Sequence, residues 1–157
     1  MLGNVNVEIR RKVFDMMKED RYEAYVHDVP GSDVVVEDSA VVVCYYGKDE
    51  ARLDSTKKAL GLFKLYKAKA GEMVFVESQL DEADAEVRDA AEDAGFAYYF
   101  VKADPDSEGL YIREALMNFG ARRTSAEKIV FLDSDIGFCN PYWLQNVSLT
   151  LDGCDMS

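Results

Sequence analysis

Two carboxylates stand two residues apart at Asp133-Ser134-Asp135, directly after the apolar run Ile129-Val-Phe-Leu132. Both side chains can reach one hard cation, because Mg²⁺ and Mn²⁺ prefer oxygen ligands and often bridge to substrate phosphates. A metal held there would neutralise a diphosphate and help it to leave. A structural interpretation competes with this one, since either aspartate can cap a turn or a helix. The chemical interpretation predicts a divalent-cation site made by Asp133 and Asp135.

The elements that must position this pair are apolar strands alternating with helices from Ser39 onward. The apolar runs are rich in β-branched and aromatic residues, which predicts buried strands over 40–46, 73–77, 96–101 and 128–132. Apolar residues at helical spacing predict helices over 50–68, 81–94 and 110–122. Gly71 and Gly95 are expected to end the first two helices. This order predicts an α/β fold: an open, mostly parallel, Rossmann-like sheet with helices on both faces.

Ligands of open parallel sheets bind beyond the carboxyl ends of the strands. The topology alone therefore selects four short segments as candidate binding loops. They are Tyr45–Gly47, Glu77–Gln79, Lys102–Asp104 and Asp133–Asp135.

Residues 1–38 are expected to form an N-terminal helix and linker outside this domain. Apolar residues at helical spacing predict a helix from Val5 to Asp20, and Pro-Gly-Ser predicts a turn over 28–33. A short strand is expected over 34–37. We therefore divide the chain into residues 1–38 and an α/β domain of residues 39–157.

Composition and charge narrow the classes of function. The 157 residues carry 30 acids and 18 bases, a net charge of −12, which repels nucleic-acid phosphates and favours cations. No apolar run approaches the roughly 20 residues of a membrane span. Cys44, Cys139 and Cys154 lack metal-ligand spacing, so we expect buried free thiols in a reducing, cytoplasmic compartment. The single His27 cannot build a histidine metal site alone.

A longer pattern surrounds the two aspartates. It consists of Ile112-Arg-Glu-Ala-Leu-Met-Asn-Phe-Gly-Ala-Arg122, a polar turn, the strand ending in Asp-Ser-Asp, and Asn140-Pro-Tyr-Trp-Leu144. This pattern resembles the nucleotide-sugar glycosyltransferases of the GT-A fold. It is most similar to the inverting, family 2-like group that includes chondroitin-polymerase-like and polypeptide-GalNAc-transferase-like catalytic domains. The likeness covers about residues 40–144 and is specific from Ile112 to Leu144.

The resemblance implies a UDP-sugar donor, a Mn²⁺ or Mg²⁺ ion, and a role for each matching position. Asp135 would ligate the metal directly, and Asp133 would lie near the metal and the ribose. Glu77 would contact the base or ribose, where the family usually has the shorter Asp. The expected nucleotide-sugar-binding residues are Tyr45, Tyr46, Gly47, Glu77, Arg113, Asn118, Gly120, Arg122 and Asp133.

Each of these positions also has a structural interpretation that the sequence leaves open. The two tyrosines can be core aromatics. Arg113 and Arg122 can pair with surface acids, which are abundant. Asn118 and Gly120 can serve close packing of a helix on the sheet.

An inverting enzyme of this fold also needs a general base, together with a further metal ligand, in an acceptor half after the Asp-x-Asp. No residue after Asp135 can be given these roles, so the catalytic residues stay unknown. The resemblance therefore implies a nucleotide-sugar-binding half, completed by a partner or a longer chain. An unclosed sheet edge would favour self-association into a homo-oligomer.

Three other classes of protein compete with this hypothesis. A catalytically incomplete binding or assembly module could keep the fold without the chemistry. A haloacid-dehalogenase-like phosphatase is disfavoured, because the 22 residues after Asp135 contain no lysine. A Rossmann dehydrogenase is disfavoured, because Gly47-Lys-Asp-Glu-Ala-Arg52 lacks the Gly-x-Gly-x-x-Gly fingerprint.

Overall fold

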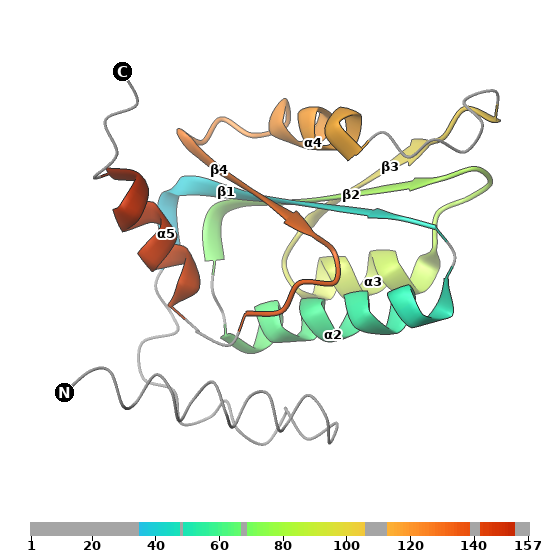
Figure 1. Cartoon of the computed structure of the whole chain (residues 1–157), viewed down its shortest axis with the longest axis horizontal. Helices are drawn as coiled ribbons and strands as arrows, with labels where there is room; N and C mark the ends of the chain where they lie inside the picture. The colour runs from blue at the N-terminus through green and yellow to red at the C-terminus, as the bar shows by residue number, and fades with distance from the viewer. Residues whose placement is uncertain (1–34, 48, 67–68, 106–112, 139–141, 153–157) are drawn as a thin grey trace.

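The computed structural model describes residues 35–47, 49–66, 69–105, 113–138 and 142–152. The expected helix over 5–20, the turn over 28–33, His27, Cys139 and Cys154 lie outside these ranges. Strands and helices alternate along the described chain (Figure 1). They are β1 (Val35–Tyr46), α2 (Glu50–Tyr66), β2 (Lys69–Gln79), α3 (Ala85–Asp93), β3 (Ala97–Lys102), α4 (Arg113–Ala121), β4 (Lys128–Asp133) and α5 (Trp143–Asp152).

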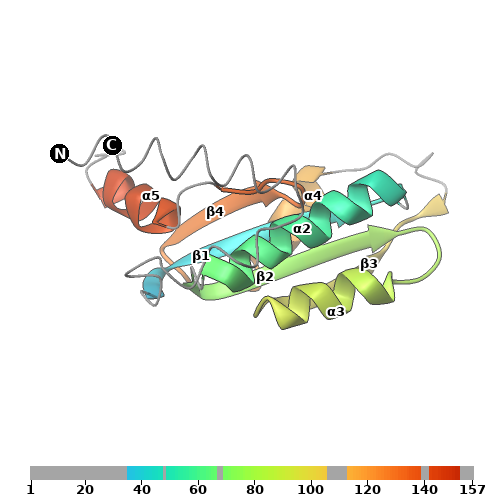
Figure 2. The same cartoon turned by 90° about the horizontal axis from the view of Figure 1, so that it is seen from below.

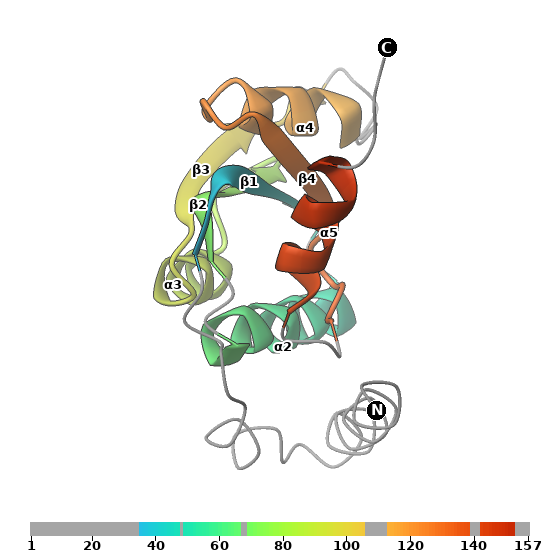
Figure 3. The same ribbon diagram turned by 90° about the vertical axis from the view of Figure 1, so that its left-hand side faces the viewer.

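The four strands form one parallel sheet in the order β3-β2-β1-β4. The chain moves outward from β1 through β2 to β3, then crosses back and places β4 on the other side of β1. Helices α2 and α3 cover one face of the sheet and α4 covers the other (Figures 1 and 3). Figure 2 shows α2 and α3 running side by side along their face. The predicted α/β fold with an open parallel sheet and helices on both faces is confirmed.

Alternation along β1 divides the core into two apolar clusters. Val41, Val43 and Tyr45 pack with side chains of α2, α3 and α5, including Leu60, Val87 and Leu144. Val42 and Cys44 pack with Leu116 of α4. Because β1 is buried on both faces, its sequence is apolar at every position from Ala40 to Tyr45.

Strand β1 is longer than expected. The short strand expected over 34–37 and the strand expected over 40–46 join into one element, Val35–Tyr46. Its register with β2 shifts between Val36 and Ala40, which accommodates the polar residues between the two apolar runs. Residues 35–38 of the expected linker are therefore part of the sheet.

The prediction that Gly71 ends a helix is wrong. Helix α2 ends at Tyr66, and Gly71 lies inside β2. A Cβ at Gly71 would lie 2.3 Å from the Glu37 carbonyl oxygen, so this glycine serves the close approach of β1 and β2. Gly95, in contrast, does follow α3, at φ +90°, where the Phe96 N–H donates to the Ala91 carbonyl in a Schellman pattern.

Candidate functional site

Asp133 and Asp135 lie at the carboxyl end of β4, beside the end of β1. Asp133 is the last residue of β4 and is in register with Cys44. The Ile136 N–H donates to the Asp133 carbonyl over 3.3 Å and closes a tight turn. Ser134, between the two aspartates, is buried, and its hydroxyl accepts a 3.1 Å hydrogen bond from Thr56 of α2. The buried serine fixes the turn, leaving Asp133 half-buried and Asp135 exposed.

Arg113, the first residue of α4, forms an ion pair with Asp133. Its Nη2 lies 2.8 Å from Asp133 Oδ1, and the two side chains are 43% and 44% exposed. Arg113 Nε is buried and has no hydrogen-bond acceptor in the described part of the chain. Burial raises the pKa of the neighbouring Cys44 thiol to about 12, so this cysteine is a neutral core group.

Arg52 lies at the same edge of the sheet and is missing from the sequence-based predictions. It stands in the first turn of α2, where its Nη1 donates to the Tyr46 carbonyl over 3.2 Å. Its guanidinium also lies 4.3 Å from the centre of the Tyr46 ring. The pKa of Arg52 is raised, chiefly by hydrogen bonding to Tyr46, with a contribution from the attraction of Asp135. Its place in the helix that follows the first strand is the sequence signal that could have identified it.

These residues gather where the strand order reverses, at the switch point between β1 and β4. We call them the switch-point cluster: Tyr46, Arg52, Arg113, Asp133 and Asp135.

Tyr45 and Gly47 flank Tyr46 but differ in environment. Tyr45 is fully buried on the α2 and α3 face, 6.4 Å from Phe75 between ring centres. Its hydroxyl has no hydrogen-bond partner among the described residues, and burial raises its pKa to about 12. Gly47 has φ +85°, and its carbonyl accepts a 3.1 Å hydrogen bond from Gln79 Nε2. Tyr45 is thus a core aromatic, whereas Gly47 makes the turn that leads out of β1.

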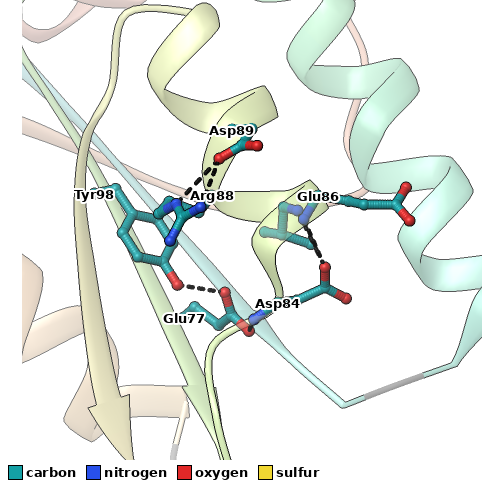
Figure 4. Close-up of polar contacts among 7 residues, drawn as sticks. Glu77, Asp84, Glu86, Arg88, Asp89 and Tyr98 are labelled. Carbon is teal, nitrogen blue, oxygen red and sulfur yellow. Dashed lines mark hydrogen bonds and ion pairs between the residues drawn. The ribbon is translucent and has the colours of Figure 1, made fainter.

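Glu77 is fully buried, and its carboxylate is bonded within the protein (Figure 4). Oε1 accepts the Asp84 N–H over 2.8 Å, and Oε2 accepts the Tyr98 hydroxyl over 2.5 Å. Asp84 is the N-cap of α3, and its side chain accepts hydrogen bonds from the N–H groups of Glu86 and Val87. The pKa of Tyr98 is raised, chiefly by burial and next by its hydrogen bond to Glu77. Glu77 therefore joins β2, β3 and the start of α3.

Asn118, Gly120 and Arg122 lie toward the other end of α4. Helix α4 begins beside the end of β4, and the loop after it returns to the beginning of β2, where Ser125 bonds Glu72. Asn118 and Arg122 are exposed. A Cβ at Gly120 would lie 2.4 Å from Val42 Cγ1, so Gly120 allows α4 to pack closely on β1. The structure does not bring these three residues into the switch-point cluster.

The donor set for a metal is small. Within the described ranges, no group of three or more histidine, cysteine, aspartate or glutamate side chains could hold an ion. Asp133 and Asp135 offer carboxylate oxygens, the ligand type that Mg²⁺ and Mn²⁺ take together with water and substrate phosphates. Among the described helices, none is long and apolar enough to cross a membrane.

Comparison with known proteins returned no family model, curated protein or solved structure that matches this chain. The features that bear on function are therefore the geometry of the switch-point cluster and the sequence pattern from Ile112 to Leu144.

Proposed function

We propose that this chain binds a nucleoside diphosphate sugar through a divalent cation at Asp133 and Asp135, as the donor-binding part of a glycosyltransferase. One observation carries the proposal. The two carboxylates and Arg113 stand at the switch point of an open parallel sheet, where such folds bind nucleotides. The resemblance of residues Ile112 to Leu144 to GT-A enzymes supports a UDP-sugar as the donor.

Each member of the cluster has a chemical role in this proposal. Asp135 is exposed and would ligate Mn²⁺ or Mg²⁺, with Asp133 completing the protein's share of the shell. The bound metal would neutralise the diphosphate leaving group. Arg113 would donate to phosphate oxygens, for which its planar fork is suited. The half-buried Tyr46 ring, with Arg52 against it, would offer a surface for the base.

The other residues that the sequence predicts to bind the nucleotide sugar give the proposal less support. Tyr45 and Glu77 are buried, and Glu77 is already bonded to the protein. Asn118, Gly120 and Arg122 lie away from the cluster. Their roles in nucleotide binding stay predictions.

The first test is a calorimetric titration of UDP into the protein with Mn²⁺ and then with EDTA. We expect binding only with Mn²⁺. Asp135→Asn should weaken this binding at least about tenfold, because a charged ligand is lost, while the fold is kept.

Asp89→Asn is the matched control, since Asp89 is exposed on α3 and pairs with Arg88, the residue before it. This variant should bind UDP as the wild type does. Equal affinity of Asp135→Asn and wild type, or binding that EDTA leaves intact, would contradict the metal role.

A binding or assembly module without catalysis is the second candidate. Two of the expected nucleotide contacts favour it. Tyr45 is buried in the core, and both carboxylate oxygens of Glu77 already accept hydrogen bonds from the protein. A protein that is folded by circular dichroism and binds neither UDP nor Mn²⁺ would support this candidate over the first.

A homo-oligomer through the sheet edge also stays a prediction. In the described structure β4 pairs only with β1, and Phe131 on β4 is 41% exposed.

A further inference from the structure

Both carboxylates of the proposed metal site already lie near an arginine. Asp133 forms its 2.8 Å ion pair with Arg113. The negative charge of Asp135 attracts the Arg52 guanidinium and contributes to the raised pKa of Arg52. Two guanidinium charges thus balance two carboxylates, as one divalent cation would.

We propose that Arg113 is a stand-in cation, which holds Asp133 while no metal is bound and transfers to the donor diphosphate when the metal arrives. This inference rests on the proposed function and deepens it. It assigns to Arg113 a coupling role between metal binding and phosphate binding.

The geometry of Arg113 permits the exchange. The ion pair is nearly half exposed on both sides, and such pairs contribute little to stability, so a competing cation can displace it. A guanidinium has five donors. One of them, Nε, is buried and lacks an acceptor among the residues described. A phosphate oxygen beside Arg113 would supply acceptors that Asp133 alone does not.

The exchange has a thermodynamic consequence. Mn²⁺ binding alone must displace Arg113 from Asp133 without giving the arginine a new partner. When a diphosphate binds with the metal, its oxygens accept from Arg113. Metal and diphosphate should therefore bind cooperatively, and removing Arg113 should change their two affinities in opposite directions.

Arg113→Ala tests this directly. Without nucleotide, Mn²⁺ should bind this variant about threefold or more tightly than the wild type, because a competing cation is gone. At saturating Mn²⁺, UDP should bind it about tenfold or more weakly, because charge-assisted bonds to phosphate are lost. Mn²⁺ binding is followed by electron paramagnetic resonance and UDP binding by calorimetry.

Two further variants serve as controls. Arg113→Lys keeps the charge beside Asp133, so Mn²⁺ alone should bind within about twofold of wild type, and UDP affinity should be partly restored. Arg123→Ala removes an equal charge at the other end of α4, where Arg123 lies over the Phe119 ring, and should change neither affinity.

The outcomes separate the inference from the function on which it rests. If Arg113→Ala binds UDP weakly but binds Mn²⁺ alone no more tightly than wild type, Arg113 is only a phosphate contact and the stand-in role is wrong. If folded wild type and all variants bind neither Mn²⁺ nor UDP with Mn²⁺, the proposed function itself is wrong. An equal effect of Arg123→Ala would reduce the result to net charge and would also overturn the inference.

Discussion

At the scale of single residues, two tyrosines show how one hydroxyl group can have opposite energetic effects. The Tyr98 hydroxyl donates to the buried carboxylate of Glu77 over 2.5 Å. The Tyr45 hydroxyl is buried and has no partner in the described structure. Bonds to a charged group are among the stronger ones in proteins, whereas an unsatisfied buried hydroxyl costs free energy.

We therefore predict opposite effects of the same chemical change at these two sites. Tyr98→Phe should lower the free energy of unfolding by about 1.5–3 kcal/mol, because Glu77 loses a donor. Tyr45→Phe should leave it unchanged or raise it by up to about 1–2 kcal/mol, because a desolvated hydroxyl is removed. Urea denaturation followed by circular dichroism measures both.

Tyr99→Phe provides the control for this pair. Tyr99 neighbours Tyr98 on β3 but packs with the α4-side cluster, so its hydroxyl does not serve Glu77. We expect a change within about 0.5 kcal/mol for a site of this kind. A Tyr98→Phe variant as stable as Tyr99→Phe would show that the bond to Glu77 contributes nothing.

At the scale of elements, α4 is the helix that connects the candidate site to the sheet. Its first residue pairs with Asp133, and Gly120 near its end contacts β1 and β2. The missing side chain at Gly120 sets how closely the whole helix approaches the sheet, and hence where Arg113 stands.

Gly120→Ala should lower the free energy of unfolding by about 1–3 kcal/mol, the usual cost of overpacking. Its Cβ would lie 2.4 Å from Val42 Cγ1 and 3.3 Å from Val76 Cγ2, so α4 must shift outward. The same variant should weaken UDP binding with Mn²⁺, because Arg113 moves with the helix.

A double-mutant cycle tests the cause. Val42→Ala removes the methyl groups nearest to the new Cβ, so the double variant should lose less stability than the sum of the single variants. Strict additivity of the two losses would mean that the contact with Val42 is not the reason.

At the scale of the whole molecule, several ionisable groups are held neutral in the core. Burial raises the pKa of Cys44 from 9.0 to about 12 and that of Tyr45 from 10.0 to about 12. The pKa of Tyr98 is raised in the same direction. Each folded-state pKa lies above its unfolded value, so the stability that these groups contribute is complete below about pH 9 and declines as pH rises toward 12.

The free energy of unfolding should therefore fall between pH 9 and pH 12, by about 1 kcal/mol or more per pH unit. Lys57 and Lys128 also have raised pKa values, chiefly through hydrogen bonds to carboxylates, and add to the fall at the upper end of this range. Urea midpoints measured at intervals of half a pH unit give the slope. Tyr45→Phe should make the slope shallower above pH 10; an unchanged slope would mean that Tyr45 ionises equally well in the folded protein.

The fold is largely predictable because each strand or helix is indicated by a pattern within its own short segment of sequence. Apolar runs such as Ala40–Tyr45 are buried on both faces, and the alternation of strands and helices determines where their carboxyl ends lie. The sequence misleads at Gly71, because glycine serves both helix ends and close strand contacts, and only the position of Glu37 distinguishes the two. The sequence analysis predicts no helix after the fourth strand, where α5 lies.

The site was predictable only in part, because its contacts are long-range. The positions of Asp133 and Asp135 follow from the end of one strand, which the sequence shows directly. The burial of Glu77 depends on Tyr98 from another strand, and the role of Arg52 depends on its proximity to Asp135. No local pattern encodes these distances.

The pairing of β1 with β4 has a consequence for how the protein reaches its native state. Strands β1, β2 and β3 pair in the order in which they follow along the chain, but β4 pairs with β1 residues that lie roughly ninety positions earlier in the sequence. Closing so long a loop is entropically costly, so we expect β4 to dock after the other three strands. Tyr46 and Arg52 belong to the early part, whereas Asp133 and Asp135 arrive with the last strand. The proposed cation site would thus be complete only at the final step of folding, and a partly folded chain would not compete for the proposed donor.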